Sequence, residues 1–215
     1  MRRLRPPSLA VARGRLAFGV LLGSWLAIVA AGLTALWRYE LADGEPGTPP
    51  ARWPESSAIA PVPGRPTLVM LLHPRCPCSR ASVEELDRVM ARVGDRVVAY
   101  VVFVVPPEDA SAWTETDLWA RASSIRGVSA VRDEGGVEAD HFQAWTSGET
   151  VLYAADGRLL FAGGITGSRG HAGDNAGEEA LVAGILRHSD MLPNAPVFGC
   201  ALPLRTQPRG APEAG

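Results

Sequence analysis

The chain has 215 residues, 47% of them hydrophobic, which favours one folded domain of ordinary size with additional segments. Its net charge is −2, but residues 1–38 carry six arginines and no acid, whereas the remainder carries 15 arginines against 23 acidic residues. An acidic folded part lacks the basic face that nucleic acids require, so we expect no nucleic-acid partner.

The amino-terminal residues have the pattern of a membrane anchor. Five arginines lie within residues 1–15, and an uncharged run of 22 residues extends from Leu16 to Trp37. Such a run can cross a bilayer core of about 30 Å, and Trp37 and Tyr39 lie where aromatic rings favour the interface. The preceding arginines favour a cytoplasmic amino terminus. We therefore expect a basic cytoplasmic segment at 1–15 and a single-pass inner-membrane helix at 16–38, with the rest of the chain in the periplasm or outside the cell.

A cleaved signal peptide is the alternative for this segment. Its apolar region would usually span about 7–15 residues and end near an A-x-A-like site. The Ala-Ala-Gly sequence near residue 31 matches such a site poorly, because the apolar run continues past it. We therefore favour the uncleaved anchor.

The remainder divides into a linker, a domain and a tail. Residues 39–65 are rich in Pro, Gly and Ser, which predicts an extended, semi-rigid linker. The sequence leaves open whether Trp53, within this linker, contacts lipid headgroups or the domain. The folded domain is expected at 66–190, followed by an irregular tail at 191–215 that contains Cys200.

Strands and helices alternate through the predicted domain. Thr67–Leu72 and Arg96–Val105 are continuously apolar, as expected of strands buried on both faces. The other predicted elements are a helix from about Ser79 to Gly94, a helix at 111–125, a short strand at 127–131, a short helix at 137–144, strands at 150–153 and 158–161, and a last helix containing Leu181 and Ile185.

Two local patterns refine this order. Ser82-x-x-Glu85 is a capping-box pattern, although the helix could begin a turn earlier, at the cysteines. Asp156-Gly157 lies between two apolar runs and predicts a hairpin that adds an antiparallel edge. The whole order predicts an α/β domain with a central mixed sheet and flanking helices, preceded by one transmembrane helix.

Two cysteines lie between the first predicted strand and the first predicted helix. The sequence His73-Pro-Arg-Cys76-Pro-Cys78 follows the strand directly. A thiolate is favoured there because the helix dipole and the free N–H groups of the first turn stabilise negative charge. Arg75 and Arg80 add positive charge within reach. These features predict a redox or thiol-reactive site at Cys76 and Cys78.

The strand, cysteines and helix together resemble thioredoxin-like proteins, above all the membrane-tethered bacterial thiol–disulfide proteins of the TlpA and ResA type. The resemblance covers roughly residues 60–190. The chain is most similar to thioredoxin-like bacterial proteins labelled RedB, on the His73-Pro-x-Cys76-Pro-Cys78 motif, the Gly-rich stretch 163–177 and Val197-Phe-Gly-Cys200. The resemblance implies a thioredoxin-like fold, whereas the RedB label implies no particular reaction.

The chain departs from the thioredoxin pattern at two places. Thioredoxins carry C-x-x-C, whereas here Ser79 occupies the place of the second cysteine and Cys78 is an added thiol if Cys76 is the first. The resemblance also implies a cis-proline before the strand at 150–153, where this chain has Gly148-Glu149. The backbone there normally pairs with the redox partner, so this departure affects partner binding.

Three cysteines are an odd number for an exported protein, so one is expected to be free, in a mixed disulfide or bound to a metal. A disulfide between Cys76 and Cys78 would close a small, strained ring, and strain makes a disulfide easier to reduce. Alternatively, Cys200 resolves a mixed disulfide with Cys76 or Cys78, or forms a static bridge that pins the tail.

Two histidines are candidates for supporting roles. His73 lies three residues before Cys76 and could assist proton transfer, ligate a metal or pack on Pro74. His171 lies in the Gly-rich stretch beside Asp174 and Asn175, where a histidine can be oriented for catalysis or ligation. We favour a loop in which Asn and Asp bond their own backbone.

These observations predict a membrane-anchored, periplasm-facing thioredoxin-like protein that is a thiol–disulfide oxidoreductase. Cys76 is the expected attacking thiolate, and Cys78, preferred over Cys200, resolves the mixed disulfide. The expected partners are protein thiols and disulfides in the periplasm. Such exchange needs no bound cofactor.

A Cu- or Zn-binding or metal-delivery protein on the same fold is the alternative. Soft thiolate and imidazole ligands suit Cu(I) or Zn, and Cys76 and Cys78 with His73 or His171 form a candidate set. A third hypothesis is a peroxidase, in which a sulfenic acid on Cys76 is resolved by Cys78.

Overall fold

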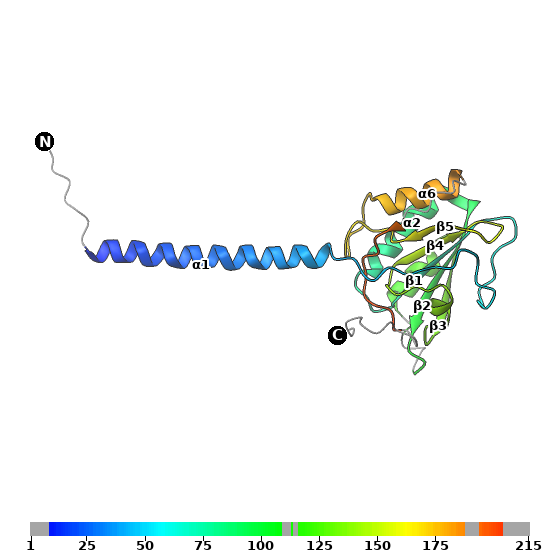
Figure 1. Ribbon diagram of the computed structural model, residues 1–215, viewed down its shortest axis with the longest axis horizontal. Helices are drawn as coiled ribbons and strands as arrows, with labels where there is room; N and C mark the ends of the chain where they lie inside the picture. The colour runs from blue at the N-terminus through cyan, green and yellow to red at the C-terminus, as the bar shows by residue number, and fades with distance from the viewer. Residues whose placement is uncertain (1–8, 109–112, 114–115, 188–193, 204–215) are drawn as a thin grey trace. The chain divides into compact units, whose positions relative to one another are not determined.

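The structure is a computed structural model that describes residues 9–108, 113, 116–187 and 194–203. The chain forms two compact units, Met1–Glu40 and Leu41–Gly215. Helix α1, Leu9–Glu40, makes up the described part of the first unit (Figure 1).

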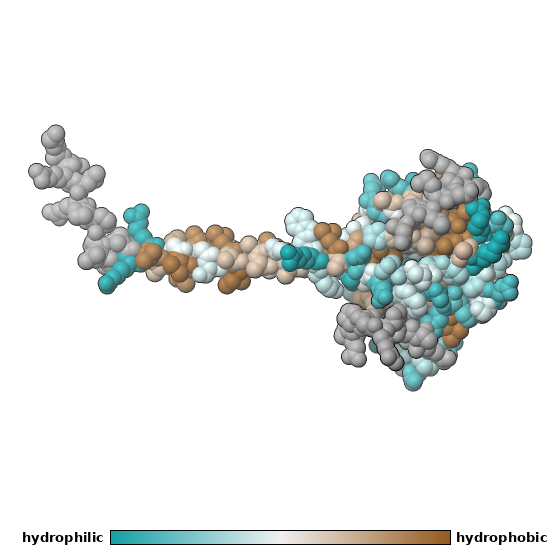
Figure 2. Space-filling model, viewed as in Figure 1, coloured by the Kyte–Doolittle hydropathy of each residue, from teal (hydrophilic) through white to brown (hydrophobic). Residues whose placement is uncertain are grey.

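Helix α1 is exposed and apolar over most of its length. Figure 2 shows hydrophobic residues along the helix, and Leu21, Trp25 and Ile28 are among its exposed side chains. Among the described residues, its part from Arg13 to Glu40 is the one helix long and apolar enough to cross a membrane. This finding confirms the predicted apolar helix, which begins earlier and ends later than the expected range 16–38.

The second unit is built on a six-stranded mixed sheet with the order β3-β2-β1-β4-β5-β6. The strands are β1 Thr67–Leu72, β2 Val98–Val105, β3 Val128–Glu134, β4 Glu149–Tyr153, β5 Leu159–Gly163 and β6 Asn194–Ala195. Strands β1, β2 and β3 are parallel, β4 is antiparallel to β1 and β5, and β6 is parallel to β5. With helices on both faces, this sheet confirms the expected α/β thioredoxin-like architecture.

The predicted hairpin of β4 and β5 is present, but it is not the edge of the sheet. The two residues of β6 pair with Ala162 and Gly163 of β5 and cover that edge. A strand of two residues is too short to show periodicity, so no sequence pattern predicts it. At the other edge, β3 extends to Glu134, because its outward side chains lie in solvent and can be polar.

The described helices of this unit are α2 Ser79–Val93, α4 Asp117–Ser124, α5 Val137–His141 and α6 Ala176–Arg187, with a short 3-10 helix η1 at Gly94–Arg96. Helix α4 is shorter than the expected 111–125, because Thr116 caps it by accepting a hydrogen bond from the Trp119 N–H. Part of that expected range lies outside the described residues. Helix α5 ends at His141 rather than at residue 144, before Gln143 adopts a positive φ of 50°.

Helix α2 begins at Ser79 with Cys78 as its N-cap residue, which confirms the expected start; Ser82 lies within the helix, so the capping-box pattern there does not form a cap. Glu85 is therefore in the second turn. Its side chain is buried and accepts hydrogen bonds from the Arg88 side chain and from the Gly173 N–H. The helix consequently begins at the cysteines, which brings them to its positive end.

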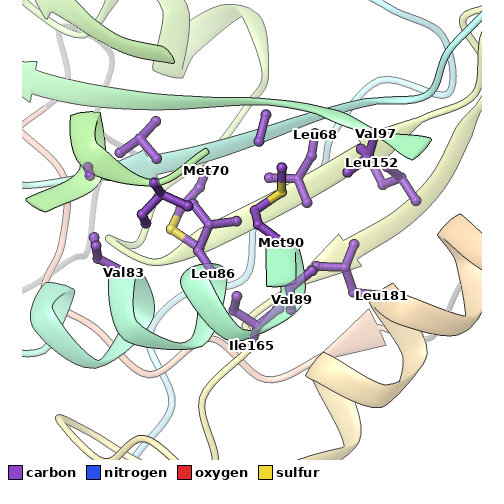
Figure 3. Close-up of a cluster of buried hydrophobic side chains, with 14 of the residues drawn as sticks. Leu68, Met70, Val83, Leu86, Val89, Met90, Val97, Leu152, Ile165 and Leu181 are labelled. Carbon is purple, nitrogen blue, oxygen red and sulfur yellow. The ribbon is translucent and has the colours of Figure 1, made fainter. Parts of the chain in front are cut away.

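The first core lies between the sheet and helices α2, α4 and α6. Figure 3 shows Val83, Leu86 and Met90 of α2 directed towards Leu68 and Met70 of β1. Alternate residues of the strands face this side, which fixes the register of β1 beneath α2. The core therefore holds the carboxyl end of β1 and the start of α2 in a defined arrangement.

The Pro-rich segment contributes to the second core, on the opposite face of the sheet. Ile59 is buried there with Val69 and Leu71 of β1. The Trp53 ring packs edge-on against the rings of Phe142 and Tyr153, with centroid distances of 5.2 and 5.3 Å. Trp53 thus contacts the domain, which answers the question that its sequence position left open.

Candidate functional site

The first two candidate cysteines lie in the turn between β1 and α2. The Cys76 N–H donates to the carbonyl oxygen of His73, and the Ser79 N–H donates to that of Cys76. Prolines 74 and 77 have no N–H and do not continue the β1 ladder. The chain therefore leaves the sheet at His73, and both cysteines lie at the amino-terminal end of α2.

The structure brings Cys200 to the same place. Its Sγ atom lies 2.9 Å from Sγ of Cys76, and the thiol of Cys78 makes hydrogen bonds with both. All three are free thiols; Cys76 and Cys78 are 4% and 6% exposed, and Cys200 is half-buried. The three cysteines, which we call the thiol cluster, are thus in mutual contact although Cys200 is 124 positions from Cys76.

Hydrogen bonds lower the pKa of Cys76 and raise that of Cys200. The thiols of Cys200 and Cys78 donate to the Cys76 sulfur, as do the N–H groups of both residues, and this outweighs the cost of burial. Either thiol could donate at 2.9 Å, and we assign the proton to Cys200 because Cys76 lies at the start of α2. Donation to Cys76 and Cys78, together with burial, accordingly raises the pKa of Cys200.

The pKa of Cys78 is subject to opposing influences. The hydrogen bond from Cys200 lowers its pKa, whereas its own bond to Cys76, its burial and the charge of Cys76 raise it more. Arg169 lowers it to a smaller extent. Of the three thiols, Cys76 is therefore the one that ionises most readily.

Residues 197–202, which we call the Cys200 segment, are held by backbone hydrogen bonds. The Ser147 N–H donates to the Cys200 carbonyl and the Leu202 N–H donates to the Trp145 carbonyl, both at 2.8 Å. These bonds form an antiparallel bridge between Thr146 and Ala201. The segment therefore pairs with the chain immediately before β4.

Two further contacts position this segment. The Arg169 guanidinium donates to the Gly199 carbonyl at 2.6 Å and to the Ala42 carbonyl at 3.0 Å. A Cβ atom at Gly199 would lie 1.8 Å from the Ser147 carbonyl oxygen, so only glycine allows this approach. The sequence Val-Phe-Gly-Cys thus has a physical requirement for its glycine.

Ser79, at the place of the second thioredoxin cysteine, has a supporting role. Its Oγ donates to the His73 carbonyl at 3.0 Å and lies 2.9 Å from Oγ of Ser147. The Ser147 Oγ in turn accepts from the His73 N–H at 2.8 Å. This buried network links the end of β1, the start of α2 and the segment that holds Cys200.

His73 lies beside the thiol cluster. Burial lowers its pKa, the nearby charge of Cys76 opposes this and that of Arg75 adds to it. Its ring packs edge-on against Trp113 at 5.5 Å, and the Arg75 guanidinium lies 3.7 Å above the same Trp ring. His73 is therefore a neutral neighbour of Cys76 at neutral pH, and it packs on Trp113.

The contacts of His171 lie within its own loop. Its Nδ1 is 2.8 Å from the Arg169 carbonyl oxygen, and its side chain is exposed. Asn175 donates to the carbonyls of Ile165 and Gly173 and accepts from the Glu178 N–H. The loop is thus held by an Asn that bonds the backbone, as the sequence favoured.

The described residues contain no group of three or more His, Cys, Asp or Glu side chains arranged to hold a metal ion. Of the four candidate ligands, Cys76, Cys78 and His73 lie together, whereas the contacts of His171 are elsewhere.

A cleft of about 350 Å³ opens next to Cys76. It is lined by Pro74, Arg75, Cys76, Pro77, Arg80, Thr116, Asp117 and Leu118. Arg80 and Asp117 form an exposed ion pair there. The cleft gives a partner molecule a route to the loop that carries Cys76.

Glu149 is a buried acidic residue whose importance the sequence did not reveal. It is the first residue of β4, and the described backbone contains no cis peptide bond. Burial raises its pKa to about 7, despite hydrogen bonds from the N–H groups of Trp145, Thr146 and Gly47. Because these N–H groups belong both to the loop before β4 and to Gly47 of the Pro-rich segment, the Glu149 carboxyl group joins the two.

No family model and no curated protein matches the chain. Among solved structures, a hypothetical protein from Sinorhizobium meliloti is similar over 78% of this chain and 99% of its own, with 19% identity and a TM-score of 0.55. An uncharacterized conserved protein from Geobacillus kaustophilus is similar over 78% and 95%, with 16% identity and a TM-score of 0.54. A secreted Mycobacterium tuberculosis disulfide oxidoreductase matches over 58% and 83%, with 16% identity and a TM-score of 0.39.

The Sinorhizobium and Geobacillus proteins are similar to this chain in fold alone, because both sequence identities are below 20%. The comparisons give the RedB label no support. Strand order, strand directions and the cysteine-bearing turn before α2 together make this chain thioredoxin-like in fold.

Proposed function

We propose that the chain is a thiol–disulfide oxidoreductase that uses Cys76 as its nucleophile. The observation that carries this proposal is the thiol cluster, in which two neighbouring thiols lower the pKa of Cys76. The attacking species in disulfide exchange is a thiolate, and a second thiol is needed to release the partner. The resemblance to TlpA- and ResA-type proteins supports the same chemistry.

The reaction proceeds in two exchanges. The Cys76 thiolate attacks one sulfur of a partner disulfide, and the other partner sulfur leaves as a thiolate. A second thiol of the cluster then gives up its proton and attacks Cys76, which releases the first partner sulfur. The partner disulfide becomes two thiols, and the cluster gains one disulfide.

The proposed location is the periplasmic side of the inner membrane. Helix α1 is long and apolar enough to span the bilayer, and arginines precede its apolar part. The positive-inside rule then favours a second unit outside the cytoplasm. Disulfides form and persist in that compartment, so protein thiols and disulfides are available there as partners.

The test is disulfide exchange between the oxidised full-length chain and dithiothreitol. Cys76→Ser is expected to lower the rate by at least about a hundredfold, because a serine hydroxyl neither forms a disulfide nor attacks one. Ser129→Ala is the matched control: it removes an exposed hydroxyl group on β3 but no thiol, and its rate should stay near that of the unmodified chain. A Cys76→Ser chain that exchanges at the unmodified rate refutes the proposal.

A further inference from the structure

The Cys200 segment occupies a backbone edge that is suited to bind another extended peptide. The Ser147 N–H and the Trp145 carbonyl point from this edge to the Cys200 segment and form its two bridging bonds. Any extended peptide that paired antiparallel with residues 145–147 would need the same two groups. The segment and an incoming peptide therefore compete for one place.

This pairing also holds the Cys200 thiol next to Cys76, where the sulfur of a substrate would lie. The bridge at Thr146 and Ala201 places the adjacent Cys200 with its Sγ 2.9 Å from Sγ of Cys76. The Cys200 thiol lies against Cys76, which is only 4% exposed. A partner that pairs with residues 145–147 must therefore displace the segment from that edge.

The segment is anchored at its start, close to the thiol cluster. At its start it is anchored by β6, which pairs with β5, and by the Gly44 N–H, which donates to the Val197 carbonyl. Beyond these anchors, the described hydrogen bonds of its backbone are the two bridging bonds, the Arg169 bond to Gly199 and the bond from the Cys200 N–H to the Cys76 sulfur. The Leu202 side chain is buried in the second core. The anchors keep Cys200 near the cluster when the bridge opens, which gives its thiol a high effective concentration.

We propose that the Cys200 segment is an internal substrate strand, which alternates with an extended, cysteine-bearing partner peptide at residues 145–147, and that Cys200 resolves the mixed disulfide. This inference rests on the proposed function of Cys76. When the strand returns, the Cys200 thiol loses its proton and its sulfur bonds to Cys76. The bond from Cys76 to the partner breaks, and the partner sulfur leaves as a thiol. A dithiol reductant restores the two cysteines.

The first experiment uses glutathione disulfide as the probe on the reduced full-length chain in detergent, followed by mass spectrometry of alkylated peptides. The chain is expected to accumulate a Cys76–Cys200 linkage. Cys200→Ser should accumulate the Cys76–glutathione adduct to at least about ten times the level in Cys78→Ser, because the anchored thiol is missing. A Cys76–Cys78 linkage, with the adduct accumulating only in Cys78→Ser, overturns the inference and leaves the proposed function intact. The absence of any adduct or disulfide at Cys76 in every chain refutes the proposed function itself.

The second experiment tests the pairing edge without altering the fold. A synthetic peptide with the sequence of Pro196–Pro203 is added to the glutathione adduct of the Cys200→Ser chain, and glutathione release is timed. The native peptide should act at least about five times faster than the same peptide with Gly199→Ala, because the added methyl group prevents the close approach to Ser147. Equal rates of glutathione release with the two peptides overturn the proposal that the Cys200 segment is an internal substrate strand.

The same substitution within the chain gives an independent check. Gly199→Ala should raise the level of the glutathione adduct although Cys200 is present. Gly167→Ala is the control, because a Cβ atom there would meet only Cβ of Asn175, at an ordinary 3.6 Å. A Gly199→Ala chain that releases glutathione as fast as Gly167→Ala contradicts the proposal.

Discussion

At the scale of single residues, Glu149 combines two opposing environments. Three backbone N–H groups surround its carboxyl group and favour the ionised form, but burial favours the protonated form and raises its pKa to about 7. A Cβ atom at Gly47 would lie 2.1 Å from Oε1 of Glu149, so the Pro-rich segment passes very close to it. The protonation of one side chain is thus coupled to the packing of that segment.

We predict that Glu149 lowers the stability of the domain as the pH rises. Its pKa is about 7 in the folded chain and 4.5 as a reference, so between these values the folded state keeps a proton that the unfolded state has lost. The free energy of unfolding should therefore fall by about 3 kcal/mol from below pH 4.5 to above pH 7 through this group. Urea unfolding at a series of pH values measures it.

The matched variant is Glu149→Gln, which cannot ionise and has nearly the same shape. Its free energy of unfolding should depend less on pH than that of the unmodified chain across the interval from pH 4.5 to 7. Other buried acids, such as Asp133, also have a raised pKa, so part of the dependence should remain. Identical pH profiles for the two chains would contradict the assignment to Glu149.

At the scale of elements, the Pro-rich segment is an integral part of the second core. Residues 51–53 pair with the hairpin of β4 and β5. The Trp53 N–H donates to the Gly157 carbonyl, and the Leu159 N–H donates to the Ala51 carbonyl. The Tyr153 hydroxyl donates to the Pro50 carbonyl at 3.0 Å. These bonds hold the segment in place without a helix or strand of ordinary length.

We predict that Trp53→Ala lowers the free energy of unfolding by about 2–3 kcal/mol, because the half-buried ring loses its packing on Phe142 and Tyr153. The neighbouring Arg52→Ala, at an exposed side chain, should change it by less than about 0.5 kcal/mol. Chemical denaturation measures both. Equal stabilities for the two variants would show that the ring does not support the core.

The elements that the sequence predicted well are those with strong local patterns. Strand β1 agrees with its predicted range, and α2 ends before Gly94, because continuous apolar runs and a helical apolar face are local signals. The contact of Cys200 with Cys76 depends on an irregular segment far away in the chain, which has no periodicity. The same holds for Trp53, whose partners follow it by about 90 to 100 residues.

At the scale of the whole molecule, the two units have separate physical roles. The second unit has its own two cores. Helix α1 instead exposes large apolar side chains along its length. The proposed anchoring and the proposed chemistry therefore belong to different parts of one chain.

We predict that a chain beginning at Leu41 is soluble, with the melting temperature and dithiothreitol exchange rate of the complete chain. The complete chain should remain in the membrane fraction after a salt wash and enter solution in detergent, because an apolar helix that spans a bilayer is not held by charge. Fractionation shows whether the complete chain is in the membrane or in solution, and its intact mass shows whether α1 is still attached. A complete chain that appears in the soluble fraction, shortened by loss of α1, would show a cleaved signal peptide.

The separation of Cys76 and Cys200 by 124 positions connects redox state to folding. A disulfide that closes a loop of over a hundred residues restricts the unfolded chain and stabilises the folded one by about 4–5 kcal/mol. By thermodynamic linkage, folding stabilises the disulfide by the same free energy by which the disulfide stabilises the fold. The reduction potential of the disulfide is therefore about 100 mV lower in the folded domain than in the unfolded chain. Reducing agents and denaturants would therefore act on a single equilibrium, and each would strengthen the effect of the other.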